Sequence, residues 1–167
     1  MKGVNCNMDR NKEELYKLLK ELEISYNIYN HDAVYTVEEA QSLNIPGYHC
    51  KNLFLRNRKG TKHYLVVIHE KKPVDLKVLS EKLGSTALSF ASEERLYKYL
   101  GLKPGAVTPF GIINDNEKEV IVVLHEELQE KEDICFHPNA NDATISVSYE
   151  DLMKFIDWNG NECMLIE

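Results

Sequence analysis

The chain of 167 residues lacks several features that mark common protein classes. No apolar run approaches the roughly 20 residues that a membrane-spanning helix needs, so no membrane segment is expected. The first residues, MKGVNCNMDRNKEE, contain no apolar stretch of the kind found in signal peptides, which favours a cytoplasmic location. The four cysteines include no CxxC pair, which argues against a zinc knuckle or a thioredoxin-type site and favours reduced thiols.

Common catalytic motifs are also missing. The sequence contains no GxSxG elbow, P-loop or GxGxxG segment. Cys135 and His137 could pair as nucleophile and base, but no third group that would orient them is near in sequence. His63 and His69 would share a strand face, a pattern more typical of exposed hairpin histidines than of metal ligands. We therefore expect no metal and no cofactor.

The charge is negative overall but unevenly distributed. A net charge of −7 disfavours a general nucleic-acid binder, and DNA in particular is not an expected partner. Residues 51–82 nevertheless hold nine Lys and Arg against three Asp and Glu, whereas residues 112–167 hold three against fourteen. The asymmetry either reflects two solvated faces of opposite sign or indicates that an anionic ligand meets one side only.

Periodicity and capping signals predict an α+β fold in one domain spanning residues 1–167. An N-cap at Asn11 and a leucine stripe indicate an amphipathic helix at about residues 11–23. The other expected elements are strand 26–29, a helix from Thr36 to Pro46, strands 53–56 and 64–68 around a turn at Gly60, helices capped by Asp75 and Ser92, strands 108–113, 120–125 and 144–148, and a helix capped by Ser148. The result is a curved mixed sheet surrounded by helices.

Three short segments carry most of the functional signal: KNLFL at 51–55, GLKPGAVTPFG at 101–111 and FHPNANDATISVS at 136–148. A lysine where a strand begins could hold a phosphate or a carbonyl, and glycines in a loop let backbone amides approach a ligand. A histidine before proline is extended and could face a site. Each feature also has a structural interpretation, as a surface lysine, a helix C-cap at Gly101 and a structural histidine.

Together these segments resemble the YbaK/ProX superfamily of aminoacyl-tRNA editing domains, and most closely the freestanding alanyl-tRNA(Pro) deacylases, from about His31 to the last helix. The resemblance implies a nearly closed barrel and hydrolysis, in trans, of alanine from mischarged tRNA(Pro). It implies no metal and no protein nucleophile, with the terminal ribose hydroxyl helping to activate water. The neighbouring branch, which removes cysteine from tRNA(Pro), and a non-catalytic tRNA- or synthetase-binding module remain as alternatives.

The resemblance also implies the site residues. The residues with an implied catalytic role are Lys51, Gly105 and His137. Those implied to bind or shape the substrate site are Asn52, Gly101, Pro104, Ala106, Val107, Pro109, Phe110, Asn141 and Thr144. The expected partner is the acceptor end of aminoacylated tRNA(Pro), with prolyl-tRNA synthetase as a further candidate. From the charge distribution we expect the tRNA to contact Arg56, Arg58, Lys59 and Lys62.

Overall fold

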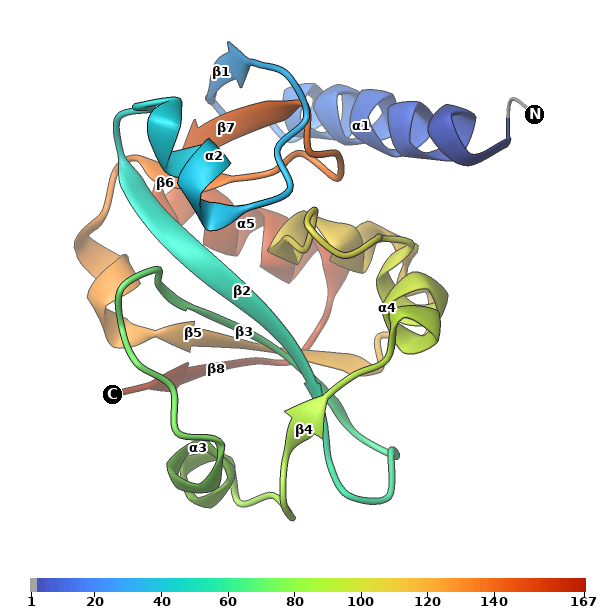
Figure 1. Ribbon diagram of the computed structural model, residues 1–167, viewed down its shortest axis with the longest axis vertical. Coiled ribbons are helices and arrows are strands. Elements are labelled where there is room, and N and C mark those ends of the chain that lie inside the picture. The colour runs from blue at the N-terminus through green and yellow to red at the C-terminus, as the bar shows by residue number, and fades with distance from the viewer. Residues whose placement is uncertain (1–2) are drawn as a thin grey trace.

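The computed structural model describes residues 3–167, with residues 3–10 and Val37 described for their backbone alone. The helices are α1 (Gly3–Glu21), α2 (Val37–Ser42), α3 (Leu76–Leu83), α4 (Glu93–Leu100) and α5 (Tyr149–Asn159), with 3₁₀ helices η1 (Pro109–Asn114) and η2 (Glu126–Glu130). The strands are β1 (Asn27–Asn30), β2 (Tyr48–Arg56), β3 (His63–His69), β4 (Ser89–Phe90), β5 (Val120–His125), β6 (Ile134–Phe136), β7 (Ala143–Val147) and β8 (Cys163–Ile166). Figure 1 shows their arrangement. Within the described residues, no helix is long and apolar enough to cross a membrane.

The strands form one mixed sheet in the order β1-β7-β6-β2-β3-β5-β8, with β4 paired to β2. The pair β2–β3 is antiparallel, as the hairpin signal predicted, whereas β3–β5, β5–β8 and β2–β6 are parallel. The expected mixed α+β fold is confirmed. The sheet is open rather than closed, because β1 and β8 lie at opposite ends of the strand order.

Strand β3 is buried on both faces and so separates two cores. Leu65 and Val67 belong to the larger core, which includes residues of α1, α4 and α5. Val66 and Ile68 point the other way, into a smaller core completed by α3. Such a continuous apolar run is expected of a strand that is covered on both sides.

The capping signals are largely confirmed. Asp75, Ser92 and Ser148 accept backbone N–H groups at the starts of α3, α4 and α5. Gly101 ends α4 in the left-handed conformation, with φ of 64°, which glycine adopts at little cost. Because Gly101 ends α4, the next segment turns back toward β2.

Three local expectations are wrong. Where strand 108–113 was expected, residues 109–114 form η1, because Pro109 occupies the first helical turn and the Thr108 side chain accepts the N–H of Phe110. The first helix begins at Gly3, and the Asn11 side chain donates to the Gly101 carbonyl instead of capping the helix. Strand β2 begins at Tyr48, so Lys51 lies within the strand and not at its start.

Candidate active site

A cleft of about 420 Å³ lies beside the first half of β2. All three sequence segments reach it: Lys51 and Asn52 from β2, Gly105 and Val107 from the loop after α4, and His137 from the loop after β6. The remaining lining residues are Val34, Tyr35, Thr36, Ala40, Gln41, Cys50, Glu70 and Lys71. Figure 1 shows α2 next to the upper end of β2, where these residues gather. The fold therefore brings together segments that are up to 86 residues apart in the sequence, from Lys51 to His137.

Lys51 supplies a cation to this cleft. It is paired across the β2–β3 ladder with Ile68, and its side chain is partly buried. Among the described residues, its ammonium has no hydrogen-bond or ion-pair partner. An ammonium is a compact charge with three donors, so Lys51 can contact a phosphate or a polarised carbonyl without first breaking an internal contact.

Asn52 joins β2 to the glycine loop and leaves one polar atom unpaired. Its Nδ2 donates to the Val107 carbonyl at 3.1 Å, and a carbonyl can only accept, so the amide orientation is determined. Its Oδ1 is buried and has no hydrogen-bond partner in the described structure. Because an unpaired buried acceptor costs free energy, this oxygen favours a ligand that donates a hydrogen bond.

The glycine loop presents backbone donors to the cleft. Gly105 has a φ of 88°, in the left-handed region that favours glycine. The N–H of Ala106 donates to the Lys103 carbonyl at 3.2 Å and is used within the turn. The N–H groups of Gly105 and Val107 have no partner among the described residues. The donors available to a ligand are therefore those of Gly105 and Val107, and not that of Ala106.

His137 is a neutral imidazole with a defined tautomer. Its Nδ1 lies 3.1 Å from the Ala143 carbonyl, which requires a proton on Nδ1 and leaves Nε2 as an acceptor. Burial lowers the pKa of His137 and is opposed by the hydrogen bond to Ala143, with smaller effects from His31, which lowers it, and Asp142, which raises it. His137 can therefore accept a hydrogen bond from water or a hydroxyl near neutral pH.

The loop that carries His137 is held by its neighbours. Asn141 makes two hydrogen bonds with Val34. Its Nδ2 donates to the Val34 carbonyl at 3.1 Å, and its backbone carbonyl accepts the Val34 N–H at 3.3 Å. His31 Nε2 lies 3.0 Å from the Thr144 hydroxyl, and Lys12 pairs with Asp142 at 3.0 Å. Asn141 does not line the cleft. Thr144 lines a smaller adjoining cavity of about 100 Å³, together with Asn52 and His137.

Besides Asn141 and Thr144, five residues expected at the site lie outside the cleft wall: Gly101, Pro104, Ala106, Pro109 and Phe110. Gly101 forms the cap of α4, and Pro104 is exposed in the turn before Gly105. Ala106 and Pro109 are buried. Phe110 is 1% exposed and packs edge-on against Phe136 and Phe155, so its side chain belongs to the main core.

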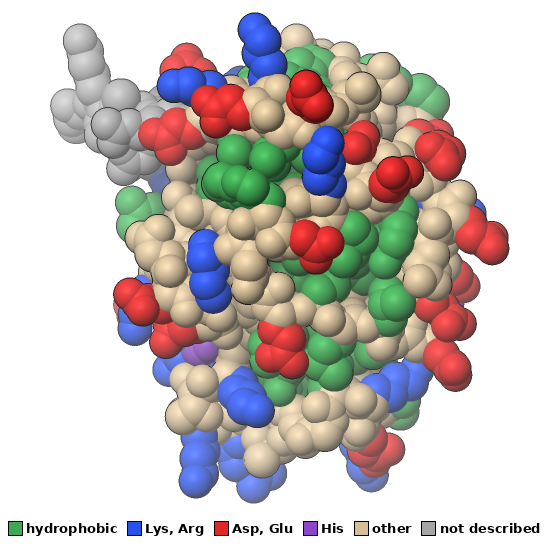
Figure 2. Space-filling model, turned by 180° about the vertical axis from the view of Figure 1, so that it is seen from behind, with side chains coloured by type: hydrophobic (Ala, Val, Ile, Leu, Met, Phe, Trp, Pro, Cys, Tyr) green, Lys and Arg blue, Asp and Glu red, His purple; other side chains and the backbone are tan. Residues whose placement is uncertain are grey.

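The basic residues Arg56, Arg58, Lys59 and Lys62 lie around the β2–β3 turn and do not line the cleft. At about 3.3 Å per residue, Arg56 is roughly 16 Å along β2 from Lys51. In the rear view of Figure 2, Lys and Arg side chains gather at the lower end, where Figure 1 shows this turn and α3. Asp and Glu predominate along the right-hand side of that view.

The sequence did not indicate every wall of the cleft. Thr36 was predicted to begin a helix, and its side chain accepts the N–H of Glu39. No sequence signal indicated that this helix would lie against β2. Glu70 and Lys71 follow β3 directly, but only the β2–β3 register, with Cys50 opposite His69, brings them near Lys51.

The Cys135–His137 alternative is disfavoured by the state of the thiol. Cys135 is buried and its thiol donates to the Pro46 carbonyl at 3.4 Å. Burial, with smaller effects from Asp133 and Glu70, raises the pKa of Cys135 to about 12. The reactive thiolate is therefore scarce near neutral pH. Among the described residues, no group of three or more His, Cys, Asp or Glu could hold a metal ion.

Comparison with known proteins identifies relatives over nearly the whole chain. Residues 31–155 match the family model of the aminoacyl-tRNA editing domain. A protein of Acetoanaerobium sticklandii named prolyl-tRNA editing protein ProX is 49% identical over 158 residues, which cover 93% of this chain and 96% of the relative. The prolyl-tRNA synthetase associated domain-containing protein 1 of Danio rerio is 35% identical, covering 87% of this chain and 81% of the relative. A solved structure of a proposed trans-editing enzyme for prolyl tRNA synthetase has the same fold, with a TM-score of 0.69, 20% identity and coverage of 92% and 94%.

Proposed function

Because the chain belongs to the aminoacyl-tRNA editing domain family, we propose that it is a trans-editing hydrolase that removes alanine from mischarged tRNA(Pro). The observation that carries this proposal is the 49% identity, over almost the full length of both chains, to a prolyl-tRNA editing protein. The meeting of Lys51, Asn52, Gly105 and His137 at one cleft supports it. The acceptor end of aminoacylated tRNA(Pro) is the proposed partner in the cytoplasm, with prolyl-tRNA synthetase as a further candidate.

The proposed chemistry is hydrolysis of the ester between the amino acid and the terminal ribose. Attack of water places negative charge on the carbonyl oxygen, and donors already aimed at that charge lower the barrier. Lys51 and the N–H groups of Gly105 and Val107 would supply those donors. The unpaired Oδ1 of Asn52 would accept from the ammonium group of the amino acid. His137 would accept a hydrogen bond from the attacking water through Nε2 and hold that water in position.

Selectivity follows from size. A synthetase pocket built for proline rejects the smaller alanine weakly, since each missing methylene is worth only about 1–3 kcal/mol. A second site too small for proline can remove the error. The adjoining cavity of about 100 Å³, lined in part by Val34, Ala40 and Phe136, is the proposed place for the alanine methyl group.

A substrate panel tests the proposal. The purified protein is incubated with alanyl-, cysteinyl-, seryl- and prolyl-tRNA(Pro), and loss of the aminoacyl group is followed with time. We expect alanyl-tRNA(Pro) to be hydrolysed fastest and prolyl-tRNA(Pro) to persist. Preferential hydrolysis of cysteinyl-tRNA(Pro) would identify the neighbouring branch. Binding without hydrolysis of any of the four would identify a non-catalytic module.

Replacement of Cys135 by Ser should leave alanyl-tRNA(Pro) hydrolysis within about twofold of wild type, because the protonated thiol has no role in the proposed chemistry. Serine is used because Cys135 also lines the adjoining cavity, and serine keeps most of its volume. Cys163→Ser is a matched control outside the cleft and this cavity; its thiol is likewise free and has a pKa raised by burial to about 11. Initial rates of deacylation and thermal midpoints are measured for both. Loss of activity in a folded Cys135→Ser protein, with Cys163→Ser active, would restore the Cys-His hypothesis.

Reversal of charge at the β2–β3 turn should weaken tRNA binding without impairing the chemical step. Arg58→Glu/Lys59→Glu should raise KM by about tenfold at low salt and change kcat little, since both residues are exposed and distant from Lys51. Lys118→Glu/Lys154→Glu, an equal charge change in the acidic part of the chain, serves as the control. An unchanged KM for the turn variant would mean that the tRNA approaches from another face.

A further inference from the structure

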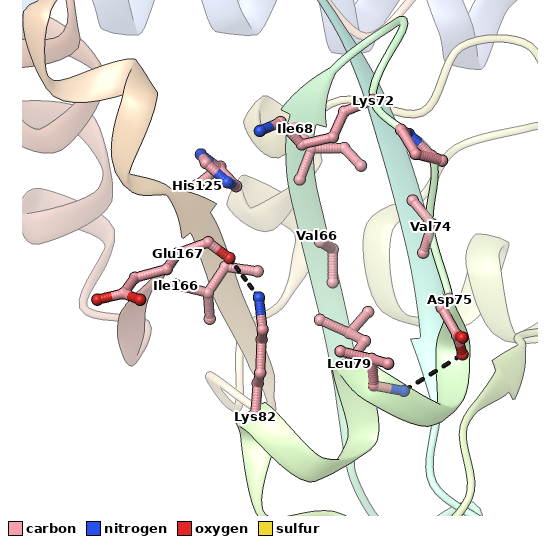
Figure 3. A pocket seen from close by; sticks show the side chains of 12 residues that line it. Val66, Ile68, Lys72, Val74, Asp75, Leu79, Lys82, His125, Ile166 and Glu167 are labelled. Atoms are coloured by element: carbon pink, nitrogen blue, oxygen red, sulfur yellow. Dashed lines mark hydrogen bonds between the residues drawn. The ribbon is translucent and has the colours of Figure 1, made fainter.

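A second cavity, of about 300 Å³, lies between α3 and the sheet. Its walls come from β3, the loop before α3, α3 itself and the ends of β5 and β8. It shares no lining residue with the cleft that contains Lys51. A volume near 300 Å³ is at the lower end of the range for small-molecule sites. Figure 3 shows this cavity from close by.

The body of the cavity is apolar. Val66 and Ile68 of β3 form one wall, and Val74 and Leu79 face them from the loop and α3 (Figure 3). Val78 also lines the cavity and is 45% exposed. A ligand with an apolar body would remove this surface from water, at a gain of about 25 cal/mol per Å².

One residue of the cavity wall, His125, is largely buried and has a ring nitrogen without a hydrogen-bond partner. His125 is 6% exposed, and its Nδ1 accepts the N–H of Glu127 at 3.2 Å. The proton of the neutral ring is therefore on Nε2, which has no hydrogen-bond partner among the described residues. Burial, and then the Lys72 ammonium, lower the pKa of His125, while the Glu127 and Glu126 carboxylates oppose the shift; the net lowering is in keeping with this neutral form. Because His125 lines the cavity, this N–H can donate to a ligand that accepts a hydrogen bond.

Charges of both signs lie around His125. The charged residues that line the cavity are Lys72, Lys82, Asp75 and Glu167, and the Glu127 carboxylate lies 3.9 Å from His125 Nδ1. Figure 3 shows Lys72 and His125 at the same end of the cavity. The Lys72 ammonium pairs with Glu127 at 2.9 Å, which leaves donors available. The Asp75 carboxylate is occupied, since it accepts the N–H groups of Lys77 and Val78 at the start of α3. An acceptor that enters this end meets a cation and an N–H donor.

We propose that this cavity is a binding site for a small carboxylic acid with an apolar body. The carboxylate accepts hydrogen bonds from His125 Nε2 and the Lys72 ammonium, and the apolar body packs against Val66, Ile68 and Leu79. The carboxylate is favoured over a neutral acceptor because charge-assisted hydrogen bonds are shorter and stronger. This site is independent of the proposed hydrolysis.

The test uses hexanoate and hexanamide, which share an apolar chain and differ in charge. Each is titrated into the ¹⁵N-labelled protein, and amide resonances are followed by NMR. We expect hexanoate to bind at least about tenfold more tightly than hexanamide, the factor that one charge-assisted hydrogen bond provides. The perturbed amides should be those of β3, α3 and His125, and not those of Lys51, Gly105 and His137.

Three variants make the test specific. Lys72→Gln should weaken hexanoate binding about tenfold and leave hexanamide binding unchanged, whereas Lys77→Gln, an equal change on α3 outside the cavity lining, should affect neither. Val78→Trp should fill the cavity and abolish binding of both. Equal affinities for acid and amide, perturbations centred on the Lys51 cleft, no measurable binding, or binding that survives Val78→Trp would each overturn the proposal.

Discussion

Replacement of Lys51 by Ala should lower the rate of alanyl-tRNA(Pro) deacylation by about 10²-fold or more. The proposed role of the ammonium is to stabilise charge that develops on the ester carbonyl or to hold the terminal phosphate. Loss of one donor aimed at developing charge costs about 10²–10³ in kcat in well-studied hydrolases. Single-turnover rates, measured with the protein in excess over alanyl-tRNA(Pro), separate the chemical step from binding.

The control for this variant is Lys71→Ala. Lys71 lines the same cleft but is exposed on the segment after β3, so it tests whether any nearby cation suffices. We expect a loss of no more than about threefold for Lys71→Ala and thermal midpoints close to wild type for both proteins. Equal losses in the two variants, or activity of Lys51→Ala within about threefold of wild type, would contradict the assignment of Lys51.

Replacement of Phe110 by Ala should lower the free energy of unfolding by about 3–5 kcal/mol, the range for removal of a fully buried phenyl ring. Phe110 is 1% exposed and makes ring contacts with Phe136 and Phe155 at centroid distances of 5.7 and 5.0 Å. Urea denaturation gives the difference directly. Phe90→Ala is the matched control, since Phe90 is 61% exposed, and its effect should remain within about 0.5 kcal/mol.

Substitutions of Phe110 also test whether this residue supports the site by packing in the core or by contact with the substrate. Asn139 donates from Nδ2 to the Phe110 carbonyl at 3.4 Å, which links η1 to the loop that carries His137. Phe110→Leu, which keeps most of the volume, should recover most of the stability and most of the activity. If Phe110→Leu were stable yet inactive, the ring would have to contact the substrate, and its assignment to the core would be wrong.

The sequence by itself determined the elements whose signals are local. Asp75, Ser92 and Ser148 mark helix starts because a short polar side chain can accept the N–H groups of the first helical turn. Gly101 marks a helix end because glycine adopts a positive φ without strain. The motifs around Lys51, Gly105 and His137 could likewise be recognised from the sequence, because each is a continuous run of residues.

Only the tertiary structure decided how these elements meet. The apolar side chains of residues 108–113 predict a strand, but burial in the core and the cap at Thr108 favour η1. Phe110 therefore lies in the core and not at the cleft. The N–H of Ala106 is unavailable because a turn to Lys103 uses it, a contact that residue type alone does not specify. Cys50, Glu70 and the residues of α2 reach the cleft through strand register and packing, and the cavity at His125 joins residues from Val66 to Glu167. Such contacts between distant residues depend on the whole packed chain, because no local pattern encodes which surfaces will face each other.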